Sequence, residues 1–204
     1  MNWLKALFGQ SGPSNLISKA DSIWMSAEGK YAGISEELNK AALEQPVAIL
    51  LVAHFDDTLA QLIELTQKHQ SSIPVAAVKA QELNSEIASG FDAQEFHALY
   101  IIVGERHPLP KEDDRVIQQF ANDLRCKCIV QFHLSLDDGI MRPFATDSVK
   151  QILEQLGIRG NDRIRSSLVE KRIRKYQLQL ATRATGNQQA ATAAEWLSLN
   201  TQNQ

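Results

Sequence analysis

The chain has 204 residues, of which 44% are hydrophobic and 22% are charged, and its formal net charge is −3. This composition is typical of one globular domain with a real core, and it excludes a disordered or a fibrous protein. A helix that spans a membrane needs roughly 20 apolar residues. The longest apolar run, residues 47–53, is only long enough for one buried strand, so we expect no transmembrane segment.

Residues 1–20 are expected to form a short amphipathic segment on a flexible tether. Four apolar side chains follow helical spacing ahead of a stretch rich in Gly, Ser and Pro: Trp3, Leu4, Leu7 and Phe8. Residues 3–8 could contact a membrane surface, a partner or the chain's own domain. The segment holds a single lysine and no small-residue cleavage site follows, so it does not resemble an export signal, and we expect a cytoplasmic protein.

Residues 21–158 alternate between helical and strand-like patterns. Helices are expected over residues 28–43, 56–69, 112–124 and 146–156, and strands over residues 47–53, 75–78, 99–103 and 129–134. Short buried strands that alternate with helices predict an α/β fold with a parallel sheet covered on both faces. Ligands of such sheets bind beyond the carboxyl ends of the strands, so the loops that follow the strands are where chemistry is expected.

Residues 159–204 are predicted to be a basic helical extension, helical from residue 163 to about 199 with an interruption at 185–187. Between Arg159 and Arg183 eight basic residues accompany two acidic ones, so this segment carries a net charge of +6 and the rest of the chain −9. The candidate binding face consists of Arg159, Arg163, Arg165, Lys171, Arg172, Arg174 and Lys175. Such a face suits an acidic protein, a membrane surface, nucleic acid or the chain's own acidic body. Nucleic acid is disfavoured because only Tyr176 is available for stacking.

No residue pattern indicates catalysis or metal binding. His54 with the nearby Asp56 and Asp57, and His107 with Glu105, are the pairs that could be considered, but the two aspartates are explained as the first residues of a helix. Cys126 and Cys128 alternate on one face of a strand and have no further cysteines to complete a zinc site, so we expect reduced core thiols. We therefore expect neither an enzyme nor a cofactor or metal.

Four stretches of the sequence, in order, carry a family resemblance. They are DSIW at 21–24 with Lys30 and EEL at 36–38, QPV at 45–47, HALYIIVGERH at 97–107, and FHLSLDDGIMRPF at 132–144, continuing through a helix to Leu156-Gly157. Together they resemble the second RecA-like motor domain of SecA, the ATPase of preprotein translocation. The resemblance implies a RecA-like, helicase C-terminal-like fold, with the first stretch in a helix ahead of the first strand. It places the basic segment where SecA begins its long scaffold helix.

The chain departs from that family in three motifs that handle ATP. It has no Gly-Lys-Ser/Thr phosphate loop. Residues 79–86 contain neither the glycines nor the arginine of the family's Gly-Arg-Gly-Thr-Asp motif, and residues 115–125 replace its glycine-rich arginine-finger loop with a helical pattern. The resemblance therefore implies a degenerate domain that stands alone.

The leading hypothesis is a non-catalytic domain that acts by protein binding or regulation in protein export, with SecA or the export machinery as partner. A second hypothesis is a residual nucleotide-binding domain that completes an ATPase site in trans, with Glu105, Arg106 and Arg125 as its remnants. A third is nucleic-acid binding through the basic helix.

Overall fold

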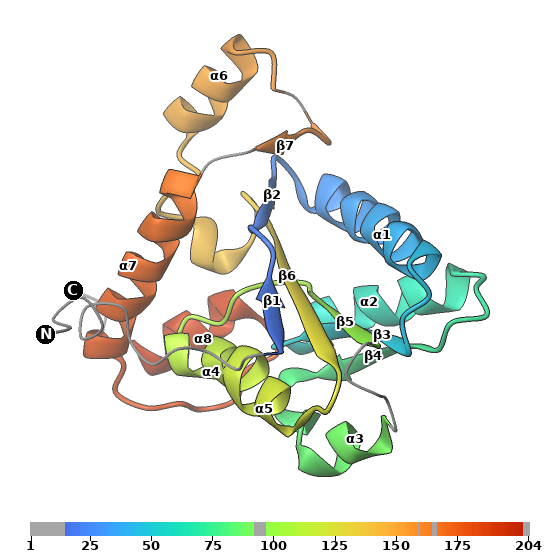
Figure 1. The fold of residues 1–204 in the computed structure, drawn as a ribbon. Coiled ribbons are helices and arrows are strands. Elements are labelled where there is room, and N and C mark those ends of the chain that lie inside the picture. The colour runs from blue at the N-terminus through green and yellow to red at the C-terminus, as the bar shows by residue number, and fades with distance from the viewer. Residues whose placement is uncertain (1–14, 92–96, 159, 165–166, 202–204) are drawn as a thin grey trace, which may run out of the picture.

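The computed structural model describes residues 15–91, 97–158, 160–164 and 167–201, so the expected amphipathic segment at residues 3–8 lies outside the described residues. Its centre is a mostly parallel sheet in the order β4-β3-β5-β6-β2-β7, with β1 also paired to β6 (Figure 1). The strands are β1 (Leu16–Ser18), β2 (Ser22–Trp24), β3 (Ala48–Ala53), β4 (Val75–Lys79), β5 (Ala98–Val103), β6 (Lys127–Ser135) and β7 (Arg163–Ile164). All pairs are parallel except that between β2 and β7. The prediction of an α/β fold is confirmed.

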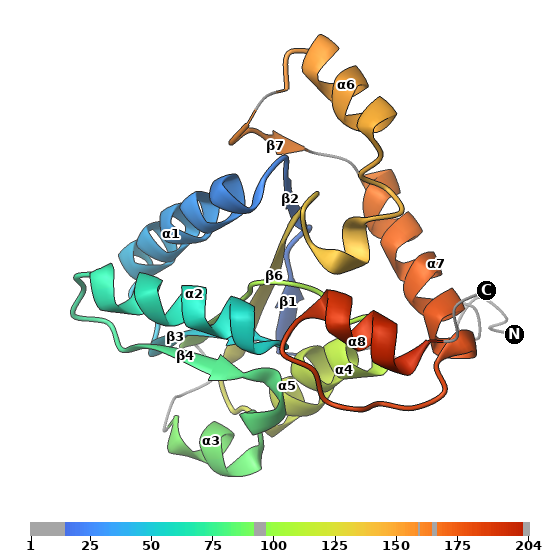
Figure 2. The ribbon, with the colours of Figure 1, turned by 180° about the vertical axis from the view of Figure 1, so that it is seen from behind.

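The two faces of the sheet are covered by different helices (Figure 2). Helix α1 (Ala27–Leu43) and α2 (Asp56–Lys68) bury Ile34, Leu38 and Leu62 against β3 and β5. The opposite face packs against α3 (Ser85–Gly90), the helical segment that begins at α4 (Pro110–Asp114), and α7 (Ser167–Arg183). Every residue of β3 is buried, as expected of a central parallel strand. Helices cover both faces, as the sequence pattern predicts.

Ser22–Trp24 form a strand rather than part of a helix, which corrects the expectation drawn from the resemblance. Strands β1 and β2 lie end to end along the same side of β6, with Leu16 opposite Cys128 and Ser22 opposite His133. All three residues of β2 are buried. Burial in the sheet therefore outweighs any local helical preference, and α1 begins only after Ser26, whose hydroxyl accepts a hydrogen bond from the Gly29 amide at 3.0 Å.

The basic extension wraps the domain instead of continuing as one long helix. Arg163 lies in β7, which pairs antiparallel with β2, so the predicted helix start at residue 163 is wrong. Helix α7 ends at Arg183 and α8 (Ala193–Asn200) lies back over the domain (Figure 2). Ile173 of α7 and Trp196 of α8 are both buried, and this burial holds the extension on the body.

Residues 110–123 are helical throughout, as predicted for the interval that replaces the arginine-finger loop. Helix α4 continues through a wide π-helical stretch, Arg115–Phe120, into α5 (Ala121–Asp123). Val116 and Phe120 enter the main core together with the free thiols of Cys126 and Cys128, which confirms the core placement of both cysteines.

Helix α6 (Asp147–Gln155) stands apart from the rest of the fold (Figures 1 and 2) and buries no residue completely. Ile152 and Leu156 are exposed on its outer side. Across the described ranges, none of the helices has the length and apolar character required to cross a membrane.

Candidate functional site at the carboxyl edge of the sheet

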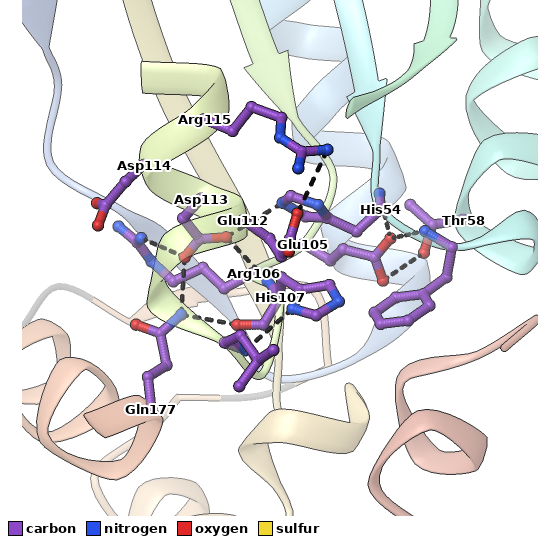
Figure 3. A network of polar contacts seen from close by, with 12 residues as sticks. His54, Thr58, Glu105, Arg106, His107, Glu112, Asp113, Asp114, Arg115 and Gln177 are labelled. Atoms are coloured by element: carbon purple, nitrogen blue, oxygen red, sulfur yellow. Dashed lines mark hydrogen bonds and ion pairs between the residues drawn. The ribbon is translucent and has the colours of Figure 1, made fainter. Parts of the chain in front are cut away.

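Polar side chains from three loops meet beyond the carboxyl ends of β3, β5 and β6. His54 follows β3, Glu105 to His107 follow β5, and Asp138 follows β6. Figure 3 shows the part of this cluster around Asp113 of α4. In parallel α/β sheets this edge is the usual place for a ligand, so these residues form the candidate site.

Asp113 is the centre of the cluster, with no exposed surface. One carboxylate oxygen, Oδ1, accepts a hydrogen bond from the His107 amide at 2.9 Å and lies 3.1 Å from His54 Nε2. The other, Oδ2, accepts from Arg106 Nη1 at 3.0 Å and from Gln177 Nε2 of α7 at 2.7 Å. Burial alone would raise the pKa of Asp113, but His54 and the Arg106 guanidinium outweigh it and hold the pKa below its ordinary value. Asp113 is therefore a buried anion with donors on both oxygens.

Arg106 joins this anion to the first strands of the chain. Its Nε and Nη2 donate to the two carboxylate oxygens of Asp21, each at 2.8 Å, and its guanidinium lies 3.9 Å from the centre of the Phe132 ring. Burial would lower the pKa of Arg106, but Asp21 and Asp113 raise it above its ordinary value. Arg106 is thus paired bidentately with Asp21 and bound once more to Asp113. These bonds occupy the donor groups with which an arginine would bind a phosphate.

Glu105 closes the loop that follows β3. Its Oε1 accepts hydrogen bonds from the amides of His54 and Phe55, both at 3.0 Å, and its Oε2 accepts from the Thr58 hydroxyl at 2.9 Å. Burial raises the pKa of Glu105 to about 7, although Lys30 and the Thr58 hydroxyl favour the charged form. This carboxyl group therefore fixes the β3–α2 turn.

Lys30 and Asp138 form a second buried ion pair at the same edge. Lys30, only 2% exposed, places Nζ 2.7 Å from Asp138 Oδ1. Asp138 also accepts from the Ser135 amide at 2.8 Å and the Ser135 hydroxyl at 2.9 Å. Burial would lower the pKa of Lys30, but Asp138 outweighs it and the pKa is raised. The pair therefore ties α1 to the end of β6.

His107 at this edge and His133 in β6 are both buried. Burial lowers the pKa of His107 to about 3, and its Nδ1 accepts the Leu109 amide at 2.9 Å. Burial also lowers the pKa of His133 to about 3, and its ring stacks on Trp24. Both imidazoles are neutral at physiological pH.

The chain's own C-terminal segment, defined as residues 184–201, covers this edge. Ala191 accepts a hydrogen bond from the Asp57 amide, in the first turn of α2, at 3.2 Å. Trp196, 1% exposed, lies edge-on to His107 at 5.1 Å and packs with Phe55 and Leu109. Cavities of about 440 and 300 Å³ remain on either side of this segment. The segment thus occupies part of the position where a ligand of this fold class would bind.

The structure brings Glu105 and Arg106 together but not Arg125. Arg125 is exposed and precedes β6, whose Lys127 lies opposite Ala98 at the start of β5, so it sits at the amino edge of the sheet. The expected grouping of these three residues is therefore not found, because their loops leave opposite ends of parallel strands. His54 pairs with Asp113 rather than with the aspartates that follow it. In the described ranges no group of three His, Cys, Asp or Glu residues could hold a metal ion.

The residues of the site that the sequence did not indicate include Asp21, Lys30, Asp113, Asp138 and Gln177. Asp21 and Lys30 lie in the first of the stretches that resemble SecA, which was the available signal. Asp113 and Gln177 had none, because an acid in a charged stretch and a glutamine in a basic helix are ordinary surface residues by pattern.

The predicted basic face lies partly on α7. Lys171, Arg172, Arg174 and Lys175 are all exposed on its outer side, and Arg174 is paired with Asp114 at 3.1 Å. Arg163 lies apart in β7, and Arg159 and Arg165 lie outside the described residues.

We predict that Asp113→Asn lowers the free energy of unfolding by about 3 kcal/mol, because it leaves the buried Arg106 charge without one of its counter-charges. Asp114→Asn is the matched control, since that carboxylate forms an exposed pair with Arg174 and should cost less than about 1 kcal/mol. Urea unfolding measures both. Equal losses in the two variants would contradict the central role of Asp113.

We predict that Glu105→Gln gains stability relative to the unchanged chain as the pH rises from 5 to 8. The folded pKa of about 7 lies above the ordinary 4.5, so the folded state holds this proton more tightly than the unfolded state. The associated stability is complete below pH 4.5 and is lost as the pH rises towards 7. Glutamine carries no such charge, so the difference in unfolding free energy should change by up to about 3 kcal/mol. A difference that stays constant over this pH range would refute the raised pKa.

Comparison with known proteins finds no matching family model, but segments of several SecA proteins are similar to this chain. The Helicobacter hepaticus protein translocase subunit SecA is 34% identical over 96 residues, covering 47% of this chain and 10% of that protein. SecA 1 of Rhodopirellula baltica is 33% identical over 134 residues, which cover 59% of this chain and 10% of that protein. SecA of Campylobacter lari is 26% identical over 193 residues, which cover 81% of this chain and 22% of that protein. The chain thus spans between a tenth and about a fifth of these relatives' length, and it resembles a fragment of SecA that corresponds to a domain.

Proposed function

We propose that this SecA-related chain is a non-catalytic domain that acts in protein export by binding another protein. The observation that carries the proposal is that the carboxyl edge of the sheet is covered by residues 184–201 of the same chain. A domain whose ligand edge is closed in this way offers its outer surfaces for recognition.

The groups that would bind a phosphate are engaged within the chain. The Arg106 guanidinium is held by Asp21 and Asp113, and the Asp57 amide at the start of α2 donates to Ala191. Helix amino termini and arginines are the groups that proteins use most often to bind phosphate and to stabilise its transfer. Their internal pairing supports a role without ATP hydrolysis.

The outer face of α7 supplies the surface for a partner. Lys171, Arg172 and Lys175 are exposed there, on an extension whose charge is opposite to that of the remaining chain. A basic helix on an acidic body favours an acidic protein surface and speeds its association. Because the chain resembles only one part of SecA, the partners we propose are SecA itself or another component of the export machinery.

We expect ATP and ADP at millimolar concentration to leave the melting temperature unchanged. A ligand at 100 times its dissociation constant would add about 2.7 kcal/mol to the unfolding free energy. A thermal-shift titration with each nucleotide, with and without Mg²⁺, measures this. A clear, saturable rise in melting temperature would contradict the proposal and favour a nucleotide-binding domain that acts in trans.

We also expect a triple variant, Lys171→Gln, Arg172→Gln and Lys175→Gln, to bind SecA of the same organism at least about tenfold more weakly, since three rim charges are lost. The control removes three exposed lysines elsewhere, Lys40→Gln, Lys68→Gln and Lys127→Gln, and should bind like the unchanged chain. Surface-bound SecA and a salt series measure the affinities. Equal weakening in both variants would show that net charge, not the α7 face, governs binding, and full-strength binding by the first would exclude that face.

A further inference from the structure

The C-terminal segment makes most of its hydrogen bonds within itself. Ala184 bridges to Thr201, and the buried Asn200 accepts the Gln188 amide at 2.6 Å while it donates to the Gln188 and Trp196 carbonyls, both at 3.0 Å. Helix α8 has a reciprocal cap, in which the Thr192 hydroxyl accepts the Glu195 amide at 3.1 Å and the Glu195 carboxylate accepts the Ala191 amide at 2.8 Å. Release of the segment would therefore break few hydrogen bonds to the rest of the described chain.

The surface beneath this segment is a groove with an apolar wall. Trp196 and Ala193 form a small buried cluster with Phe55 and Leu109, separate from the two main cores. Gly139 forms the floor, because a Cβ atom at this position would lie 2.9 Å from the Ala194 nitrogen. The groove therefore takes an aromatic side chain at one point and the small residues of a close helix at another.

Polar contacts join the segment to the groove at Ala191 and at Asn187. The Asp57 amide donates to Ala191, and Asn187 Nδ2 donates to Glu112 Oε1 at 3.1 Å. The first of these bonds places a backbone carbonyl of the segment at the positive end of α2. Any segment with a free carbonyl before its helix can make the same bond.

The two cavities of the edge lie on opposite sides of this segment. Ala191 and Trp196 line the cavity of about 440 Å³, while Thr192, Ala193 and Ala194 line the cavity of about 300 Å³. Residues 191–196 are the part of the chain that separates them. If the segment left, the two cavities would join into one cleft over the strand ends.

We infer that this groove is a binding site for a helix of a protein partner, and that α8 occupies it in cis. The inference rests on the proposed protein-binding function and names a surface distinct from the basic face. The seated segment defines the chemistry of the partner: an aromatic residue with small residues two and three positions before it, after a helix cap with a free carbonyl. Aromatic anchors in a groove are a recurrent way to bind a helix.

The test uses the full chain and a fluorescent peptide with the sequence of residues 184–201. Trp196→Ala weakens the tethered segment and leaves the groove intact, so this variant should bind the peptide at least about tenfold more tightly than the unchanged chain, in which the tethered copy competes at millimolar effective concentration. A peptide that carries alanine in place of its tryptophan should not bind. Fluorescence anisotropy measures both.

A second change separates the groove from non-specific binding. Gly139→Ala, added to Trp196→Ala, fills the floor and should abolish peptide binding. Gly90→Ala is the matched control, since a Cβ atom there meets nothing within 4 Å, and it should leave peptide binding unchanged.

Three results would overturn the inference. The peptide could bind the unchanged chain and Trp196→Ala with equal affinity, the alanine peptide could bind, or the peptide could fail to bind Trp196→Ala. Recognition of SecA by the α7 face would stand in each case, because it is measured on the unchanged chain. If circular dichroism shows that Trp196→Ala does not fold, Asn200→Ala replaces it, since that change loosens Gln188 and leaves the groove residues in place. This variant should then show the same gain in peptide affinity.

Discussion

The fold depends on the neutralisation of one charge that water cannot reach. Asp113 is fully buried, and an unpaired carboxylate at such a position would be strongly destabilising. Groups from three parts of the chain balance this charge: Arg106 after β5, His54 after β3 and Gln177 in α7. Arg106 in turn holds Asp21 just ahead of β2. One buried anion therefore links three strands and the basic helix.

This network changes what the edge of the sheet can do. An arginine and a helix amino terminus beside strand ends are elements of a phosphate site in many α/β proteins. Here Arg106 and the Asp57 amide are both bound to groups of the same chain. Similarity to a part of SecA is thus combined with an edge that is closed from within. The positive charge of α7 remains exposed on the outside of the domain.

The sequence predicts those elements whose pattern is local. Strand β3 is a continuous apolar run, and α1 has regular helical spacing with a capping serine, so both were placed correctly. Strands β1, β2 and β7 were missed, because two or three residues carry no periodic signal and tertiary contacts decide how they pair. The prediction of a flexible tether is therefore wrong for Leu16–Ser18, which form β1. Glu105 and Arg106 were identified through the resemblance, whereas Asp113 was not, because its partners Arg106, His54 and Gln177 are brought to it only by the fold. The grouping of Arg125 with Glu105 and Arg106 is wrong, because Arg125 precedes its strand whereas the other two follow theirs, and the strands are parallel.

The position of β1 and β2 on β6 has a consequence for how the chain is made. Leu16 pairs with Cys128 and Ser22 with His133, so β1 and β2 leave the ribosome more than 100 residues ahead of their partners. At ordinary rates of synthesis that delay is on the order of ten seconds. During this interval Ile23 and Trp24, which are buried in the finished sheet, have no β6 to cover them. Closure of the sheet is a late and non-local step of folding, and the nascent amino-terminal strands are the part of the chain with most need of protection by a chaperone.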